Sequence, residues 1–356
     1  MSDSRMDRMK AWRLPRRPKM APTAEDADVT GDEPPLDVDP VVPPEERGRT
    51  LRLAGWLAAV TLAGVVAAWT VWATGSPTEA DLREEARLVG KQELLIGVKD
   101  DTPGIALRDP DTGRYEGFDI EIAYMVAGEL GFSPRQVRFL AIKTEDRGRM
   151  QAVDQDGRFA TVDLVVATYS VTAQRTAQIY MSEPYLETEQ TVVTRRDHVD
   201  VASLGDLAGE KACTLATSTS EDQLRQAGAT PVNKNRISEC IEGLRAGKFD
   251  AVTTDAAILA GFVAKYPKEL RAHDIGLSAA ERWGIATGRN RALRTLVNLA
   301  LYRSYADPKD RRWEKAFDTY LAPLQKANGG QQVAVSEQPW IDEPDVRRWP
   351  WERDIP

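Results

Sequence analysis

Cysteine and histidine are scarce in this chain of 356 residues, which has two of each. So few ligands leave almost nothing for a structural zinc site of four cysteine or histidine side chains. The formal net charge is −8, which argues against a protein whose main task is to bind nucleic acid. The sequence also lacks G-x-S-x-G, H-E-x-x-H and a glycine-rich phosphate loop, so the common motifs of hydrolases, zinc proteases and nucleotide-binding enzymes are missing.

The first part of the chain has an uneven distribution of charge. Residues 1–20 carry seven Lys and Arg, whereas residues 21–46 carry nine acidic residues and no basic one. Proline is frequent in this region and large apolar side chains are few, so it cannot bury enough surface to offset its chain entropy. We predict that residues 1–52 form a disordered tail.

Residues 53–73 are an uninterrupted run of uncharged and mostly apolar residues. As a helix this run would be about 31 Å long, which matches the hydrocarbon core of a membrane. Basic residues precede it and none follows before Arg83, so the positive-inside rule predicts a cytoplasmic tail and an extracytoplasmic remainder. A cleaved signal peptide is the alternative interpretation, but the segment that precedes the run is too long for one.

Residues 74–92 are polar and are expected to form a linker. From residue 93 to residue 324, strand-like apolar runs alternate with helical patterns, which predicts an α/β fold with mostly parallel sheets covered by helices. This length fits two lobes better than one sheet. Residues 325–356 have little periodicity and are predicted to form an irregular extension. The predicted strands are 94–98, 137–142, 163–168, 191–194, 211–215, 250–254 and 284–287, and the predicted helices are 118–130, 147–153, 220–228, 237–247, 256–266, 292–306 and 311–322.

Four segments point to a family when they are taken in order. They are IGVKDDTPGIALRDPDTGRYEGFDIEIA (96–123), VDLVVATYSVTAQRTAQIYMSEPY (162–185), KACTLATSTSEDQL (211–224) and SECIEGLRAGKFDAVTTDAAILAG (238–261). They resemble the family 3 bacterial extracellular solute-binding proteins, and the last two are similar in particular to the glutamate- and aspartate-binding class. The resemblance implies a two-lobed periplasmic-binding-protein type II fold that closes on an amino acid. Its expected parts are lobe 1, residues 93–188 and 286–324, and lobe 2, residues 189–285.

Polar side chains follow several predicted strands at their carboxyl ends, where ligands bind in open parallel sheets. This placement does not depend on the resemblance, and it predicts a cleft lined by the ends of these strands. The residues concerned are Lys99, Thr168, Ser170, Thr219 and Asp255.

The resemblance gives each of these side chains an expected role. Arg175 completes a T-x-x-R pattern that is similar to the family's α-carboxylate site, and its planar fork matches two carboxylate oxygens. Ser170 and Thr219 would donate further hydrogen bonds, and Asp255 would accept the ammonium group. The alternative interpretations are helix capping by Ser170, Thr219 and Asp255, and a solvent-exposed helix position for Arg175.

The charge of the site indicates the charge of the ligand. A second carboxylate on the ligand must be paired when it is desolvated, and Lys99 and Arg147 supply the cations. Thr144 and Arg147 form a pattern similar to that of the acidic-ligand class, and Thr144 would donate alongside. Three cations against Asp255 leave a net charge of +2, which suits L-glutamate or L-aspartate. If Arg147 only decorates a helix, glutamine or another polar amino acid is the alternative ligand.

The resemblance also implies a disulfide between Cys213 and Cys240, because the acidic-ligand class has cysteines at both places. Outside the cytoplasm, two thiols without metal partners most simply form a disulfide. Two buried free thiols are the alternative.

We therefore expect a membrane-anchored receptor that closes on an acidic amino acid and is not an enzyme. It would serve an ABC-type permease or a membrane signalling partner. An enzyme on the same fold, such as a dehydratase, is the alternative. His198 and His273 lie in polar contexts and are expected at the surface, so neither indicates a catalytic base. No cofactor, metal ion or nucleic-acid partner is expected.

Overall fold

The computed structural model describes residues 45–154, 156–276 and 280–347, without the side chains of 45–47 and 71–74. The chain divides into two units, Met1–Val71 and Trp72–Pro356. Most of the tail predicted for residues 1–52 lies outside the described residues, and so does the end of the predicted C-terminal extension.

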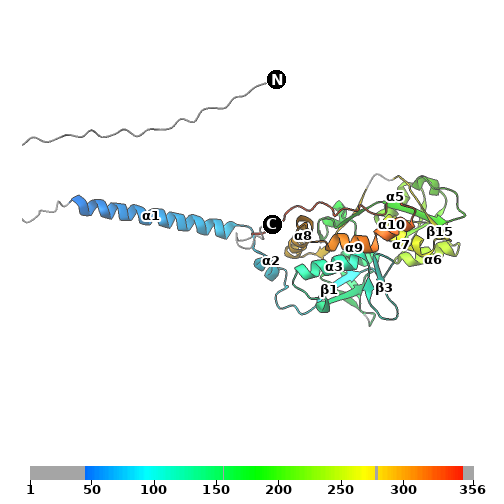
Figure 1. The fold of residues 1–356 in the computed structure, drawn as a ribbon, viewed down its shortest axis with the longest axis horizontal. Coiled ribbons are helices and arrows are strands. Elements are labelled where there is room, and N and C mark those ends of the chain that lie inside the picture. The colour runs from blue at the N-terminus through cyan, green and yellow to red at the C-terminus, as the bar shows by residue number, and fades with distance from the viewer. Residues whose placement is uncertain (1–44, 155, 277–279, 348–356) are drawn as a thin grey trace, which may run out of the picture. The chain divides into compact units, whose positions relative to one another are not determined.

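Helix α1 (Glu45–Thr74) dominates the described part of the first unit (Figure 1). Its stretch Gly48–Thr70 is long and apolar enough to cross a membrane, with a mean hydropathy of 1.8, and none of it is buried. A signal sequence near an N-terminus has the same length and composition. The helix therefore is a candidate membrane span whose orientation is a matter for experiment.

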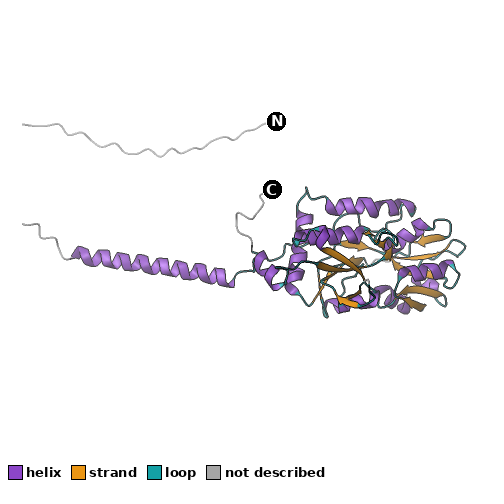
Figure 2. Ribbon diagram, turned by 90° about the horizontal axis from the view of Figure 1, so that it is seen from below, coloured by secondary structure: helices purple, strands orange, loops and turns teal. Residues whose placement is uncertain are grey.

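In the second unit, strands lie between layers of helices and form two separate main sheets (Figure 2). We call the part built on the larger sheet lobe 1. In the described residues this sheet has seven strands. Strand β1 pairs parallel with β5 and with β8, and every other pair of neighbouring strands is antiparallel. Their order is β7 (Phe159–Thr161), β6 (Gln151–Val153), β5 (Val137–Ala141), β1 (Leu94–Val98), β8 (Leu164–Val165), β17 (Ala286–Gly288) and β9 (Tyr180–Met181).

Apolar faces of several helices cover the lobe 1 sheet. Helix α3 begins after Gly117, whose φ of 130° and close approach to the Ile105 carbonyl leave no room for a side chain. Phe118 at its start stacks edge-on against Trp313, with 5.8 Å between the ring centroids, and both side chains are fully buried. The helices of this lobe are α2 (Glu79–Glu85), α3 (Phe118–Glu129), α4 (Ala173–Thr176), α8 (Arg291–Ala306) and α9 (Arg312–Tyr320).

Lobe 2 is the part built on the smaller main sheet. Its described strands run in the order β13 (Thr230–Lys234), β12 (Lys211–Leu215), β14 (Ala251–Asp255), β11 (Gln190–Arg195) and β15 (Leu270–His273). The first three are parallel, and β11 is antiparallel to both of its neighbours. Its α-helices are α5 (Thr219–Gln226), α6 (Ile237–Arg245) and α7 (Ala256–Lys265).

Two short strands connect the lobes. The chain passes from lobe 1 to lobe 2 through β10 (Leu186–Thr188) and returns through β16 (Glu281–Trp283), and these two strands pair antiparallel. We call this pair the hinge. A further small sheet, of β2 (Asp101–Thr102), β3 (Ala106–Arg108) and β4 (Tyr115–Glu116), follows β1, and α10 (Ala322–Ala327) follows α9.

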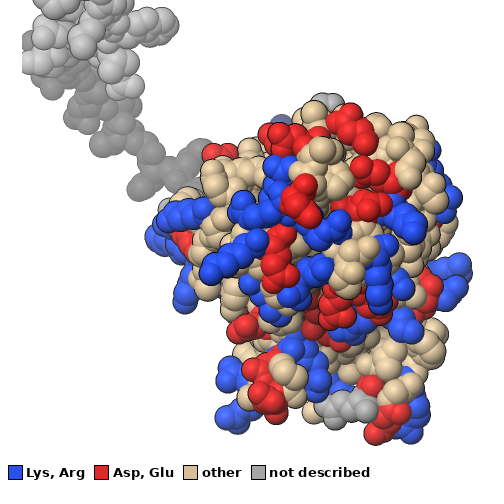
Figure 3. Space-filling view, turned by 90° about the vertical axis from the view of Figure 1, so that its right-hand side faces the viewer, with Lys and Arg blue, Asp and Glu red and all other residues tan. Residues whose placement is uncertain are grey.

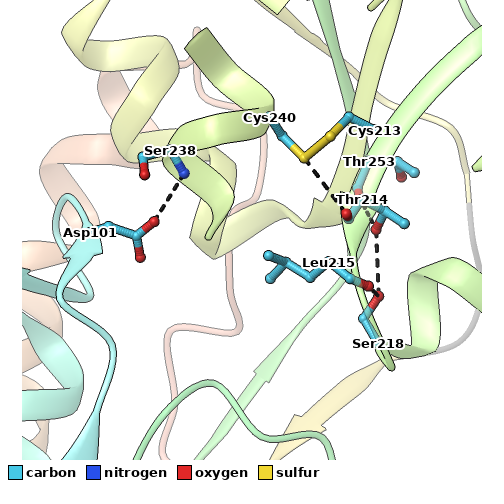
Figure 4. Close-up of a disulfide and its surroundings, with 8 residues drawn as sticks. All are labelled: Asp101, Cys213, Thr214, Leu215, Ser218, Ser238, Cys240 and Thr253. Carbon is cyan, nitrogen blue, oxygen red and sulfur yellow. Dashed lines mark hydrogen bonds between the residues drawn. A yellow bond between two sulfur atoms is a disulfide. The ribbon is translucent and has the colours of Figure 1, made fainter. Parts of the chain in front are cut away.

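The disulfide implied by the resemblance is present in lobe 2. Cys213 in β12 and Cys240 in α6 are joined, with 5.5 Å between their Cα atoms, and both are fully buried (Figure 4). The backbone N–H of Ser238, also in α6, donates a 3.0 Å hydrogen bond to Asp101 of β2. The disulfide therefore fixes a helix that contacts both lobes.

Three local predictions were wrong. Residues 45–52, predicted to be disordered, form the start of helix α1. Residues 147–153 are not a helix: a 3₁₀ turn (Thr144–Arg149) ends at Met150, which has a left-handed φ of 57°, and β6 follows. Pairing of β6 with β7 overrides the local helical pattern. His273 is not at the surface but buried in β15, where its ring contacts Thr194 and accepts from the Val201 N–H. Burial lowers the pKa of His273, which favours the neutral ring.

Candidate functional site

A cavity of about 780 Å³ lies between the two lobes. Lobe 1 contributes Thr144, Tyr169 and Arg175 to its walls, and lobe 2 contributes Thr217 and Thr219. These residues are far apart in the sequence but lie beyond the carboxyl ends of strands, where ligands bind in open sheets. Of the five side chains predicted from the strand ends, Thr219 lines this cavity, whereas Lys99, Thr168, Ser170 and Asp255 do not.

A larger cavity of about 1060 Å³ is lined mostly by lobe 1, including Lys99, and also by Asn235 and Arg236 of lobe 2. Its walls include Tyr115, Tyr124 and Arg236, with acidic and basic side chains intermixed. Arg175 lines the smaller cavity but not this one, and Arg147 and Asp255 line neither. Size alone therefore does not make it the better candidate site.

Lys99, which lines the larger cavity, and Thr144, which lines the smaller one, form a polar pair. Lys99 follows β1 and is 3% exposed, and its Nζ donates a 2.9 Å hydrogen bond to the Thr144 hydroxyl. Burial, reinforced by the charge of Arg147, lowers the pKa of Lys99 to about 8. The Lys99 ammonium group is thus largely excluded from water, so it would attract a bound anion strongly.

Arg147 is also buried, and its guanidinium is held by backbone oxygens. Nε donates to the Thr144 carbonyl at 3.1 Å, and Nη1 donates to the carbonyls of Ala167 and Thr168 at 3.1 and 2.8 Å. Burial and the nearby Arg175 lower the pKa of Arg147 to about 10. The alternative that Arg147 only decorates a helix does not fit a side chain that is 3% exposed.

Tyr169 was not identified from the sequence, yet it contacts both arginines. Its ring centroid lies 4.5 Å from the guanidinium carbon of Arg147 and 4.6 Å from that of Arg175. Only its position between Thr168 and Ser170 would have indicated this role, because an aromatic residue in an apolar strand usually packs in the core.

Arg175 bridges the two lobes. Its Nη1 donates to the Ser170 carbonyl at 2.8 Å in lobe 1, and its Nη2 donates to the Thr217 carbonyl at 3.0 Å in lobe 2. Helix α4, which carries Arg175, is capped by the Thr172 hydroxyl. The side chain is therefore directed into the cleft and is not a free helix arginine in water.

Thr168 has a left-handed backbone, with φ of 48°, which is rare for a β-branched residue. Its N–H donates to Asp119 at 3.0 Å, and the same carboxyl accepts from the Tyr185 hydroxyl at 2.8 Å. Burial raises the pKa of Asp119 to about 7. The Thr168 hydroxyl is buried and has no hydrogen-bond partner among the described residues, which is unusual for a buried polar group.

Asp255 ends β14 and precedes α7, but its side chain does not cap that helix. It accepts a hydrogen bond of 2.5 Å from Nε1 of Trp283 in the hinge strand β16. Burial, and next the charge of Glu281, raise the pKa of Asp255 to about 8, while Arg147 and Arg175 act in the opposite direction. By position Asp255 is the N-cap residue of α7, but the interpretation that its carboxyl caps the helix is wrong.

Ser170 and Thr219 complete the predicted set. Ser170 is buried and forms an isolated bridge with Trp283. Thr219 is the first residue of α5, but Ser218 is its N-cap, with the hydroxyl accepting from the Glu221 N–H at 3.2 Å. The capping interpretation of Thr219 is wrong as well, which leaves its hydroxyl available to the cavity.

The charges of the cleft are incompletely paired. Among the described residues, no carboxylate oxygen lies within 4.0 Å of the cationic nitrogens of Lys99, Arg147 or Arg175. The same ranges of the chain contain no group of His, Cys, Asp and Glu that could hold a metal ion. On the outer face seen in Figure 3, by contrast, basic and acidic side chains are intermixed.

Comparisons with known proteins agree with this architecture. "Glutamate-binding protein GluB" of Corynebacterium efficiens is 30% identical over 269 residues, which are 72% of this chain and 88% of that protein. "ABC transporter glutamine-binding protein GlnH" of Bacillus subtilis is 29% identical over 58% of this chain and 75% of its own length.

An ancestral arginine-binding protein solved with glutamine is 28% identical, with a TM-score of 0.57 over 65% of this chain and 98% of that one. The model of the bacterial extracellular solute-binding proteins, family 3, matches residues 94–317. This chain belongs to the family 3 bacterial extracellular solute-binding proteins.

Proposed function

We propose that the protein is a receptor for an acidic amino acid, L-glutamate or L-aspartate, and that its two lobes close on the ligand about the hinge. In this proposal lobe 1 comprises residues 93–188 and 286–324, and lobe 2 comprises residues 189–285. The relatives named for glutamate and glutamine support an amino-acid ligand.

The observation that carries the proposal is the set of cations without carboxylate partners. Lys99 and Arg147 are each 3% exposed, and an unpaired buried charge is costly. A ligand with two carboxylates would pair with Arg175 at one end and with Lys99 and Arg147 at the other. Thr144, Thr168, Ser170 and Thr219 would then donate hydrogen bonds to its oxygens.

The ammonium group of the ligand belongs at Asp255. Trp283 fixes one oxygen of this carboxyl, and Glu281 adds a second negative charge nearby. Lys99, Arg147 and Arg175 outnumber Asp255 and Glu281 in either protonation state of Asp255, so positive charge is in excess among these groups. An acidic amino acid carries a net negative charge that offsets this excess, whereas glutamine carries none.

Glutamine is the second candidate, because two of the compared proteins are named for it or were solved with it. A neutral side-chain amide would leave Lys99 or Arg147 without a counter-charge. We therefore propose that glutamine binds more weakly than L-glutamate or L-aspartate.

We further propose that α1 anchors the receptor in the membrane with its N-terminus in the cytoplasm. Delivery of the amino acid to an ABC-type permease and reporting of closure to a membrane signalling partner are both consistent with such an anchor. The receptor would release its ligand unchanged, without acting as an enzyme.

Calorimetric titration of residues 75–356 with each of the twenty amino acids tests the ligand. We expect L-glutamate or L-aspartate to bind most tightly and glutamine to bind more weakly. Binding of glutamine with no heat from either acid would show that the charge argument is wrong.

A further inference from the structure

The segment after α10 lies outside the residues that match the family, yet it is packed against the protein. We call residues 329–347 the C-terminal strap; it is red in Figure 1. Val333, Ala334 and Ile341 are buried within it, with exposed fractions of 3%, 2% and 1%. The strap is thus irregular, as predicted from the sequence, but it is not a loose tail.

The strap begins at lobe 2 and then crosses the hinge. Just before it, the Asn328 side chain donates to the Ala260 carbonyl of α7 at 3.2 Å. The Val335 N–H donates to the Glu187 carbonyl of β10 at 2.8 Å, and the Thr188 hydroxyl donates to the Val333 carbonyl at 2.6 Å. Since β10 also pairs with β16, the strap adds a third chain segment to the hinge.

The strap then follows lobe 1 to the residues that come directly after α1. Trp340 stacks edge-on against Tyr305 of α8, with ring centroids 5.4 Å apart. At its end, Asp345 accepts from the Ser76 hydroxyl, and the Arg347 N–H donates to the Pro77 carbonyl at 2.9 Å. Residues 76–78 lead into α2, so the strap connects the hinge to the beginning of the second unit.

We propose that the C-terminal strap couples bending of the hinge to the segment that follows α1. When the lobes move, β10 changes its twist, and the backbone groups bonded to it must move with it or lose their hydrogen bonds. The buried side chain of Ile341 and the contact between Trp340 and Tyr305 hold the middle of the strap in place. Movement at β10 is therefore transmitted to residues 76–78. The ligand-driven part of this inference rests on the proposed function.

Two variants break the strap at opposite ends. Val335→Pro removes the N–H that bonds to the hinge, and Arg347→Pro removes the N–H that bonds to Pro77, because proline has no backbone donor. Glu337→Pro is the matched control, since Glu337 is an exposed strap residue for which no hydrogen bond is found. A spin label on Gly75→Cys reports the mobility of the segment after α1; both native cysteines are in the disulfide, so the new thiol is the only free one.

The full chain in lipid nanodiscs is measured with and without L-glutamate, and ligand affinity is measured in parallel. We expect glutamate to change the mobility of the label in the parent chain and in Glu337→Pro. We expect both strap variants to bind glutamate within about threefold of the parent and to lose at least half of the mobility change. A full mobility change in both strap variants, or none in a parent chain that binds glutamate, would overturn the proposal.

Hydrogen exchange of the ligand-free chains keeps the test independent of the ligand. Val335→Pro should speed amide exchange at Arg347, twelve residues away, whereas Glu337→Pro should not. Unchanged exchange at Arg347 in Val335→Pro would contradict coupling along the strap, even if no amino acid binds. Absence of binding in every chain, together with faster exchange, would instead count against the proposed function alone.

Discussion

The indole Nε1 of Trp283 donates a hydrogen bond of 2.5 Å to Oδ2 of Asp255. Trp283 belongs to the hinge and Asp255 ends a strand of lobe 2, so one hydrogen bond joins the hinge to the expected ammonium site. The bond fixes the orientation of the carboxyl before a ligand arrives.

Affinity for glutamate should depend on pH. Burial and Glu281 raise the pKa of Asp255 to about 8, so below that pH the ligand-free carboxyl holds a proton that an ammonium group must displace. Affinity should rise about tenfold per pH unit up to about pH 8. It should fall again at higher pH, because burial lowers the pKa of Lys99 to about 8 and Lys99 then loses its charge.

Calorimetry between pH 6 and pH 9 measures this dependence. Glu281→Gln, which removes the neighbouring charge, should move the rising part of the profile to lower pH. An affinity that is constant from pH 6 to pH 8 would contradict the role of Asp255.

The raised pKa of Asp255 also means that the folded, ligand-free protein loses stability as pH rises from the ordinary Asp value of 3.8 toward 8.

The two arginines should differ in their effect on ligand choice. Arg175→Ala removes the partner of a carboxylate that all amino acids share, so glutamate and glutamine should both lose roughly 30-fold or more in affinity. Arg147→Met should cost glutamate a similar factor and glutamine less than about threefold. Arg158→Ala is the control, because that arginine is exposed, pairs with Asp156 and lines neither cavity. Equal losses for both ligands in Arg147→Met would show that the side-chain site is assigned wrongly.

Tyr169 should position both arginines. Tyr169→Leu removes the ring that both guanidinium groups contact, at a cost of about 1 kcal/mol for each contact, and should weaken glutamate binding by about 10- to 30-fold. Tyr169→Phe keeps the ring and should restore affinity to within about threefold. A loss of equal size in Tyr169→Phe would assign the effect to the hydroxyl group and not to the ring.

Removal of the disulfide should affect stability more than binding. The bridge closes a loop over a separation of 27 residues, and its contribution is about 3 kcal/mol. Replacing both cysteines by serine should lower Tm by about 6–12 °C while ligand affinity stays within about threefold. Scanning calorimetry and a binding titration of the same sample decide this, and an unchanged Tm would refute the structural role.

The sequence predicted the parts of the fold that depend on local periodicity. Strands β1 and β12 match their predicted bounds, and Thr219, predicted from the end of β12, lines the cavity between the lobes. What it could not predict depends on long-range packing. The burial of His273 follows from pairing of β15 with β11, and the position of Tyr169 follows from α4 and the 3₁₀ turn placing two arginines beside one ring. The strap was predicted as irregular, but its contacts with the hinge have no sequence signature.

Membrane topology is a prediction that spheroplasts can test. If α1 is an uncleaved span, protease added to intact spheroplasts should digest residues 75–356 and leave a protected N-terminal fragment of about 8 kDa. A mature protein that begins near residue 74 and is released would instead identify the apolar segment as a signal peptide.

A crystal structure of residues 75–356 with L-glutamate tests the central claim most directly. We predict that the α-carboxylate contacts Arg175, that the ammonium group contacts Asp255, and that the side-chain carboxylate lies within hydrogen-bond distance of Lys99 or Arg147. A complex in which the side-chain carboxylate contacts neither of these cations would contradict our assignment of the site.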